Sequence, residues 1–194
     1  MRLFVAVETG PDIASAVMPI VAELRRRAER LAPLARITWA VPPRVHLTLR
    51  FIGEVSPEKA EAISAALVRG VPRMPFQVEI GGAGVFPERG PARVLWLGLT
   101  SGVEPMLRLE EQVSSRLAQL GIAPDTRPYH PHVTLGRVRD ASGLRPAALF
   151  QGIADATLGP FQVSSYTLFE SRRTAGGTEY VPLVRTRLAC QPVD

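Results

Sequence analysis

The chain has 194 residues, of which 46% are hydrophobic and 21% charged, a composition that supplies a buried core of ordinary globular size. The formal net charge of +5 favours anionic partners such as nucleic acid or phosphate, although an arginine-rich composition of this kind is also typical of a GC-rich genome. Cys190 is the only cysteine, which excludes an internal disulfide and argues against a cysteine-based metal site.

The distribution of apolar residues bears on the compartment in which the protein works. No apolar run is long enough to span a bilayer, and the first twelve residues read as a strand rather than as a secretory signal. We therefore expect a cytoplasmic protein with no membrane partner.

Hydrophobic periodicity predicts five elements in the first half of the chain. A short apolar run predicts a strand at 2–7, and apolar residues at helical spacing predict a helix over 12–33. Alternation that ends at a glycine predicts a strand at 45–53. A serine N-cap followed by proline predicts a helix over 56–70. The last element is a strand at 76–86, which we expect to be bent or bulged at its glycines.

The second half repeats this order of elements and ends with one further strand. The predicted elements are a strand at 93–100, a helix over 103–121, a strand at 132–138, a short helix over 143–155, a strand at 161–171 and a last strand at 179–189.

Two short motifs recur at the same offset. "HLTLRF" begins at His46 and "HVTLGR" begins at His132, an offset of 132 − 46 = 86 residues. "PFQV" begins at residue 75 and again at residue 160, an offset of 160 − 75 = 85 residues. The agreement within one residue, in the same order of elements, predicts an internal duplication.

The duplication defines the expected architecture. Each copy is a strand–helix–strand–helix–strand unit, the first over about residues 1–90 and the second over about 91–175, with a C-terminal strand appended. Because each unit is small, the two are expected to share one core. We therefore predict that residues 1–194 form a single bilobal α+β domain, with the two histidine strands facing each other across a central cleft.

The paired His-x-Thr motifs point to phosphate chemistry. On a strand, residues i and i+2 share a face, so His46 lies beside Thr48 and His132 beside Thr134, with the apolar alternates behind them. Two imidazoles that titrate near pH ~6.5 on opposite sides of a substrate form an acid–base pair, which an in-line displacement at phosphorus requires. Threonine hydroxyls can donate to phosphate oxygens. Arg137 can add a charge-assisted contact, provided that a bulge or the strand end turns it inward.

These residues carry a resemblance to a known family. The segments "RLFVAV", "HLTLRFIGEV", "GVFP", "VLWLGL", "RPYHPHVTLGR" and "LFESR" cover nearly the whole chain in family order. The sequence resembles the 2H phosphoesterase superfamily and, more closely, the RNA 2',3'-cyclic phosphodiesterases of bacteria and archaea, historically called 2'-5' RNA ligases. The resemblance implies a bilobal α+β fold with both motifs in a central cleft.

The resemblance also implies an activity and a set of roles. The activity is metal-independent and cofactor-independent hydrolysis of a 2',3'-cyclic phosphate at an RNA end to a 2'-phosphomonoester, with 2'-5' joining as the reverse reaction. His46 would donate a proton to the departing 3'-oxygen, and His132 would be the base that activates water. Thr48 and Thr134 would hold the phosphate, and Arg137 falls where the family has a basic residue. The duplicated residues by themselves do not distinguish the acid from the base.

Several alternatives stay open at this stage. The substrate can be another cyclic phosphate, such as ADP-ribose cyclic phosphate, or the protein can be a non-catalytic RNA-binding module with a basic cleft. Arg50 shares the face of His46 by spacing, and lines the cleft or points to solvent. His130 has no carboxylate or cysteine cluster beside it, so we expect it to flank the cleft or cap a turn, with no metal bound. We expect a monomer.

Three aromatic residues are candidates for a role in base recognition. Trp39, Phe86 and Trp96 can stack on a base, as aromatic side chains do in proteins that bind single-stranded RNA. Aromatic residues make up only 6% of the chain, however, and most of them are expected in the core.

Overall fold

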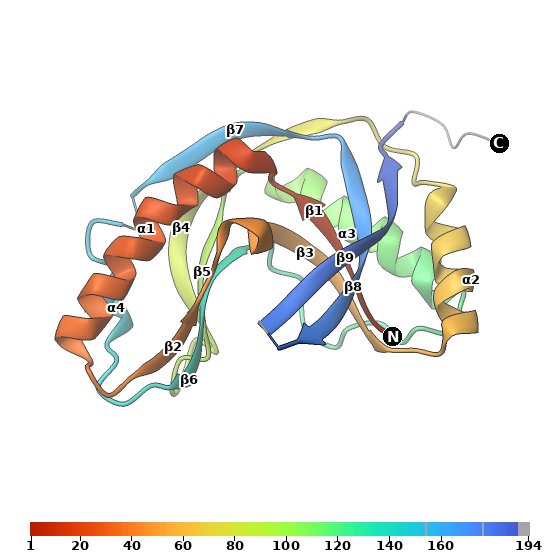
Figure 1. Cartoon of the computed structure of the whole chain (residues 1–194). Helices are drawn as coiled ribbons and strands as arrows, with labels where there is room; N and C mark the ends of the chain where they lie inside the picture. The colour runs from red at the N-terminus through yellow and green to blue at the C-terminus, as the bar shows by residue number, and fades with distance from the viewer. Residues whose placement is uncertain (154, 176, 190–194) are drawn as a thin grey trace.

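The computed structural model describes residues 1–153, 155–175 and 177–189 (Figure 1). The strands are β1 (Arg2–Glu8), β2 (Arg36–Trp39), β3 (His46–Glu54), β4 (Phe76–Phe86), β5 (Val94–Ser101), β6 (Val133–Asp140), β7 (Thr157–Val163), β8 (Ser165–Thr174) and β9 (Gly177–Arg187). The helices are α1 (Gly10–Leu31), α2 (Pro57–Val68), α3 (Val103–Ala118) and α4 (Pro146–Phe150), together with the 3-10 helix η1 (Pro42–Arg44).

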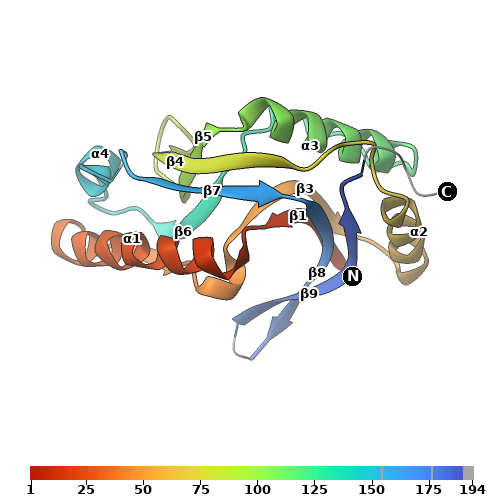
Figure 2. The same cartoon turned by 90° about the horizontal axis from the view of Figure 1, so that it is seen from above.

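The strands form one antiparallel sheet in the order β7-β4-β5-β6-β3-β1-β8-β9, with β2 paired to β6. The sheet curls into an arch, with α1 and α4 outside one arm and α2 outside the other (Figure 1). Seen from above, α1 and α3 lie on opposite sides of the strands (Figure 2). The α+β class predicted from the sequence is confirmed.

The two faces of the sheet bury different clusters, as β1 illustrates. Leu3, Val5 and Val7 join the main core, which the helices cover. Phe4 and Ala6 point to the other face, where they form a small cluster with Phe169. We call this second face the cleft face, because the histidine motifs lie on it. The alternation of β1 therefore separates a packed interior from the lining of the cleft.

Two pairings join the halves of the chain. β3 meets β6 at one pair, Leu47 with Val133, whose offset is 133 − 47 = 86 residues. β4 meets β7 through Gln77 and Gln162, whose offset is 162 − 77 = 85 residues. In each case a strand pairs antiparallel with its counterpart at the sequence offset, as a two-fold relation between the units requires. The internal duplication itself stays a prediction.

Three differences from the predicted elements concern the connections. The strand predicted at 161–171 is divided at Ser164, because β7 pairs with β4 in one arm of the arch and β8 pairs with β1 in the other. The helix predicted over 143–155 is shorter, since α4 spans only Pro146–Phe150. β2 was not predicted, because its four residues are too few to show a period. Cys190 lies outside the described residues.

None of the helices in the described part of the chain is long and apolar enough to cross a membrane.

Candidate functional site

The His-x-Thr motifs meet where β3 and β6 cross the centre of the sheet. Leu47 and Val133, the pair that joins the two strands, are completely buried in the main core. Their neighbours therefore turn to the cleft face, with His46 opposite Thr134 and Thr48 opposite His132 in an antiparallel pair. In a regular pair, diagonal neighbours such as the two histidines are about 7–8 Å apart, which leaves room for a phosphate between them.

Backbone carbonyls orient both imidazole rings. Nδ1 of His132 lies 2.7 Å from the carbonyl oxygen of His130, two residues upstream. His46 makes the equivalent hydrogen bond to the carbonyl of Arg44, also two residues upstream. Nε2 of His46 is 3.1 Å from Oγ1 of Thr48. A neutral ring whose Nδ1–H is donated to a carbonyl presents a lone pair at Nε2, which can accept a proton.

The surroundings lower the pKa of both histidines. Burial lowers the pKa of His46 to about 4, and the charges of Arg137 and His132 lower it further, against the opposing effects of the Arg44 carbonyl and Glu8. Burial also lowers the pKa of His132, against the hydrogen bond to the His130 carbonyl, which raises it, and the charges of the His130 ring and Arg137 lower it further. Two conclusions follow. Both rings are neutral at pH 7, and Arg137 is close enough to act on both.

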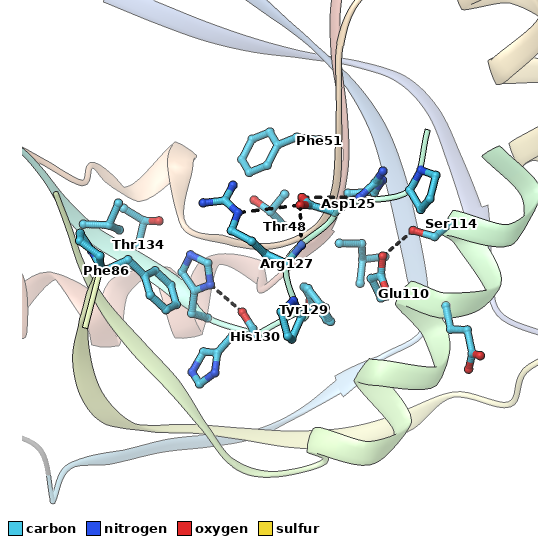
Figure 3. Close-up of a pocket in the computed structure, with 18 of the residues that line it drawn as sticks. Thr48, Phe51, Phe86, Glu110, Ser114, Asp125, Arg127, Tyr129, His130 and Thr134 are labelled. Atoms are coloured by element: carbon cyan, nitrogen blue, oxygen red, sulfur yellow. Dashed lines mark hydrogen bonds and ion pairs between the residues drawn. The ribbon is translucent and has the colours of Figure 1, made fainter. Parts of the chain in front are cut away.

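A cavity of about 920 Å³ opens beside the motifs (Figure 3). Thr48, His132, Thr134 and Arg137 line it. His46 is not among the lining residues, but it is hydrogen-bonded to Thr48, which is. The structure therefore brings four of the five predicted site residues to one cavity and the fifth into contact with it through Thr48. Their chemical roles stay predictions.

A β-bulge directs Arg137 into the cavity. β5 pairs Trp96 with Thr134 and Leu95 with Gly136, so Leu135 is an extra residue in β6. The bulge reverses the alternation after Leu135, and Arg137 consequently joins the face of Thr134. The condition that the sequence set for this arginine, a bulge that turns it inward, is met.

A matching bulge in β3 has the opposite consequence for Arg50. β1 pairs Ala6 with Thr48 and Val5 with Arg50, so Leu49 is the extra residue. Arg50 is therefore paired with Val5 and not with a residue of the cleft face, so it does not share the face of His46. It nevertheless lines the cavity, which is one of the two alternatives that the sequence left open. Phe51, which pairs with Phe4, takes the position on the cleft face instead, where its side chain is 55% exposed.

The cavity has a second arm under α3. Figure 3 shows Phe86 and Thr134 at one end of the cavity and Glu110 and Ser114 at the other. Arg50 lines this arm, where it donates to the Ala123 carbonyl and lies 3.5 Å from a carboxylate oxygen of Asp125. Glu110, Glu111 and Asp125 also line this arm, together with Arg127, which lies 3.8 Å from the other carboxylate oxygen of Asp125.

Aromatic rings surround both histidines. Phe86 lines the cavity and lies edge-on to His132 with ring centroids 5.1 Å apart. Trp96 packs on His130 at 4.6 Å, which places His130 at the flank of the cleft, as expected. Trp39 packs against the main core instead. On the other side, Phe4 and Tyr180 lie 5.3 Å and 5.4 Å from His46.

Sequence reasoning missed Phe4 and Tyr180. Phe4 sits in an unbroken apolar run, and Tyr180 belongs to the last strand, far along the chain from either motif. The sequence held a signal only for Phe4. Successive side chains of a strand point to opposite faces of the sheet, so every second residue of this apolar run must point away from the main core.

Among the described residues, no group of three or more histidine, cysteine, aspartate or glutamate side chains is arranged so that it could hold a metal ion.

Comparison with known proteins places the chain in a family. Residues 11–175 match the family model of the 2'-5' RNA ligase superfamily. The chain belongs to this superfamily, and the assignment made from the paired motifs is confirmed.

Individual relatives cover most of the chain. An RNA 2',3'-cyclic phosphodiesterase of Aeropyrum pernix is 36% identical over 146 residues, which cover 74% of this chain and 82% of the relative. One of Escherichia coli is 32% identical over 194 residues, which cover 96% of each chain. The crystal structure of E. coli LigT complexed with 3'-AMP superposes with a TM-score of 0.68 at 30% identity, covering 96% of this chain and 97% of that one.

Proposed function

We propose that this protein hydrolyses 2',3'-cyclic phosphates at RNA ends to 2'-phosphomonoesters, with His46 and His132 as the acid–base pair. The observation that carries the proposal is the antiparallel pair of His-x-Thr strands, whose polar residues surround one position beside a cavity. The relatives named RNA 2',3'-cyclic phosphodiesterase support the choice of substrate.

The reaction balances with two proton transfers. Nε2 of His132 takes a proton from water as the water oxygen attacks phosphorus. The bond between phosphorus and the 3'-oxygen breaks, and His46 gives a proton to that oxygen. The product carries the phosphate on its 2'-oxygen. Because attack and departure occur on opposite sides of phosphorus, the two imidazoles must approach from opposite sides.

The other three residues act on the phosphate. The hydroxyls of Thr48 and Thr134 donate to its non-bridging oxygens, and the guanidinium of Arg137 stabilises the charge that accumulates on them in the transition state. While His46 is neutral, its Nε2 accepts a hydrogen bond from the hydroxyl of Thr48, which holds that ring in place, and once His46 is protonated that hydroxyl can donate to the phosphate. Water supplies the attacking oxygen, and the side chains take and give the protons.

The test is hydrolysis of a nucleoside 2',3'-cyclic phosphate in EDTA, followed by separation of the 2'- and 3'-phosphate products. We expect the 2'-phosphate, and we expect His46→Ala and His132→Ala each to lower kcat by about 10²–10⁴-fold. Thr157→Val, on the exposed side of β7, is a control that should retain activity. A wild-type protein that gives no 2'-phosphate would refute the proposal.

Two further assays test the alternatives, a different cyclic phosphate substrate and a non-catalytic role in RNA binding. A relative that prefers ADP-ribose cyclic phosphate would turn over that compound faster than a nucleoside 2',3'-cyclic phosphate. A non-catalytic RNA-binding module would bind RNA in a salt-dependent manner and keep that binding after both histidines are replaced.

We extend the proposal to three further properties that follow from the same assignment. The reverse reaction would join an RNA 2',3'-cyclic phosphate to a 5'-hydroxyl through a 2'-5' linkage, because a catalyst acts in both directions. The protein would act as a monomer, and it would act in the cytoplasm, where its RNA substrates arise.

A further inference from the structure

A second, smaller hollow of about 540 Å³ lies beside the strands that carry the histidine site. Its charged lining consists of Arg2, Arg139 and Arg173, and no acidic residue lines it. The remaining lining residues are small or hydroxyl-bearing: Ser171, Thr174, Gly177 and Thr178. Three guanidiniums that face one hollow repel each other unless an anion enters it.

The three arginines have no carboxylate partners in the described ranges of the chain. The arginines that do form ion pairs lie elsewhere, as Arg172 does with Glu170 and Arg185 with Glu8. Arg2, Arg139 and Arg173 are also exposed, so their charges are available to a ligand. The hollow therefore combines unpaired positive charge with hydroxyl donors, a set of groups that suits a phosphate.

Two strands connect the hollow to the histidine site by the same step of two residues. On β6, Arg139 follows Arg137 with buried Val138 between them, so both arginines share the cleft face. On β9, Thr178 precedes Tyr180, whose ring lies 5.4 Å from His46. A step of two residues along a strand is about 7 Å.

A third strand, β1, makes the same connection and lies in the same arm of the arch as β9. On β1, Arg2 precedes Phe4, whose ring lies 5.3 Å from the ring of His46. On β8, Arg173 pairs with Thr178 of β9, so the hairpin contributes two groups from adjacent strands. Three strands, β1, β6 and β9, thus each carry a residue of the hollow two positions away from a residue beside the histidine site.

The charge distribution distinguishes two directions in which an RNA chain can leave the histidine site. The arm of the first cavity under α3 holds charges of both signs, since Glu110, Glu111 and Asp125 line it beside Arg50 and Arg127. The hollow beside Arg139 is lined by positive charge alone. The hollow therefore attracts an RNA backbone more strongly than the arm under α3, where carboxylates offset the arginines.

We propose that this hollow binds the phosphodiester that links the last two nucleotides of an RNA whose terminal 2',3'-cyclic phosphate occupies the histidine site. The proposal rests on the proposed function, because it takes the position of the cyclic phosphate from it. It predicts that the protein distinguishes an RNA end from a free cyclic mononucleotide by one negative charge.

The test compares three substrates that end in the same 2',3'-cyclic phosphate. The first is a mononucleoside, the second is a dinucleotide with a natural phosphodiester, and the third is the same dinucleotide with an uncharged methylphosphonate linkage. We expect kcat/KM for the natural dinucleotide to exceed that for the methylphosphonate by about tenfold or more, as a charge-assisted contact implies.

A double variant removes the proposed contact and a matched double variant controls for charge. R139Q/R173Q should abolish the preference for the charged linkage, change activity on the mononucleoside less than about twofold, and reduce the salt slope of dinucleotide affinity by about 0.7. R69Q/R145Q removes the same net charge at exposed ends of α2 and α4 and should retain the preference.

The outcomes separate the two proposals. A wild-type protein that hydrolyses all three substrates without regard to linkage charge overturns this inference and leaves the proposed function standing. The same follows if R69Q/R145Q loses the preference as fully as R139Q/R173Q, because net charge alone would then explain it. A wild-type protein inactive on all three substrates overturns the proposed function, and this inference with it.

Discussion

The sharpest test of the site is the protonation of His46 with and without a bound phosphate. Burial lowers the pKa of this ring to about 4 in the empty site, so at pH 7 only about one molecule in 10³ carries the imidazolium. An acid that protonates the departing 3'-oxygen must nevertheless hold a proton. The substrate can supply the missing stabilisation, because it places a negative charge beside the ring.

The size of this effect follows from Coulomb's law. One negative charge about 4 Å from the ring, at an effective dielectric constant of about 20, contributes about 4 kcal/mol. Since one pKa unit corresponds to about 1.4 kcal/mol, the bound phosphate raises the pKa of His46 by about 3 units. The expected pKa in the complex is therefore about 7, where the ring can serve as an acid at neutral pH.

NMR titration of the histidine ring carbons measures both values. The signals are assigned with His46→Gln and His132→Gln, and the titration is repeated with saturating nucleoside 2'-phosphate. We expect an apparent pKa near 4 for the free protein and an increase of about 3 units in the complex. Arg137→Gln should raise the free value of both rings, because the guanidinium lowers both. A His46 that titrates near 6.5 when free, or that fails to respond to the ligand, would refute this reasoning.

Three other predictions address binding, stability and packing. Thr48→Val and Thr134→Val should each lower kcat/KM by about 10-fold to 100-fold through loss of a hydrogen bond to a charged phosphate, while Thr157→Val has no effect. The folded-state pKa of His46 lies below its unfolded value, so the unfolded chain binds more protons below pH 6.5. His46 should therefore lower the free energy of unfolding by about 3 kcal/mol between pH 6.5 and 4. In urea titrations, the free energy of unfolding of His46→Gln should fall by about 3 kcal/mol less than that of the wild type over the same pH range. Gly84→Ala should lower the free energy of unfolding by about 1–3 kcal/mol, because the added Cβ would lie 2.2 Å from the indole above it, and a variant as stable as wild type would contradict the packing.

The sequence predicted the parts of the site that depend on period and repetition. A period of two identified the strands of both motifs, and the recurrence of His46 at His132 identified the family and the activity of its relatives. The same recurrence anticipated that the motifs meet, because equivalent strands of a duplicated unit tend to pair at the axis that relates them. Both signals, the period of a strand and the repetition of a motif, can be recognised in the sequence alone.

The sequence did not predict the two bulges, and they decide which side chains enter the cleft. Leu49 and Leu135 look like ordinary buried alternates, and an extra residue in a strand changes the pairing partner rather than the composition. Spacing alone therefore assigned Arg50 to the face that Phe51 occupies. A bulge brings Arg137 to the face of Thr134, and a bulge likewise takes Arg50 off the face of His46. A bulge is fixed by the neighbouring strand, which no window of sequence contains.

The division of the predicted strand 161–171 has a similar origin. Its apolar alternation changes phase at Ser164, from Phe161 and Val163 to Tyr166 and Leu168, and β7 and β8 pair with strands in different arms of the arch. Pairing partners distant in sequence decide where this strand ends. The pairing of β8 with β1 also places two residues of the C-terminal hairpin against the first half of the chain: Phe169 packs on Phe4, and Tyr180 packs on His46.

The duplicated motifs reach chemical asymmetry through their surroundings rather than through their own residues. His46 is flanked by Phe4 and Tyr180 and interacts with Glu8, whereas His132 has a second imidazole, His130, beside it. A carboxylate favours the protonated form of one ring, and a neighbouring ring that can become cationic disfavours it in the other. Burial and the charges of Arg137 and His132 oppose the effect of Glu8, and together they leave the pKa of His46 at about 4 in the empty site. The assignment of acid and base therefore stays a prediction, and Glu8→Gln should lower the pKa of His46 further, because the carboxylate raises it.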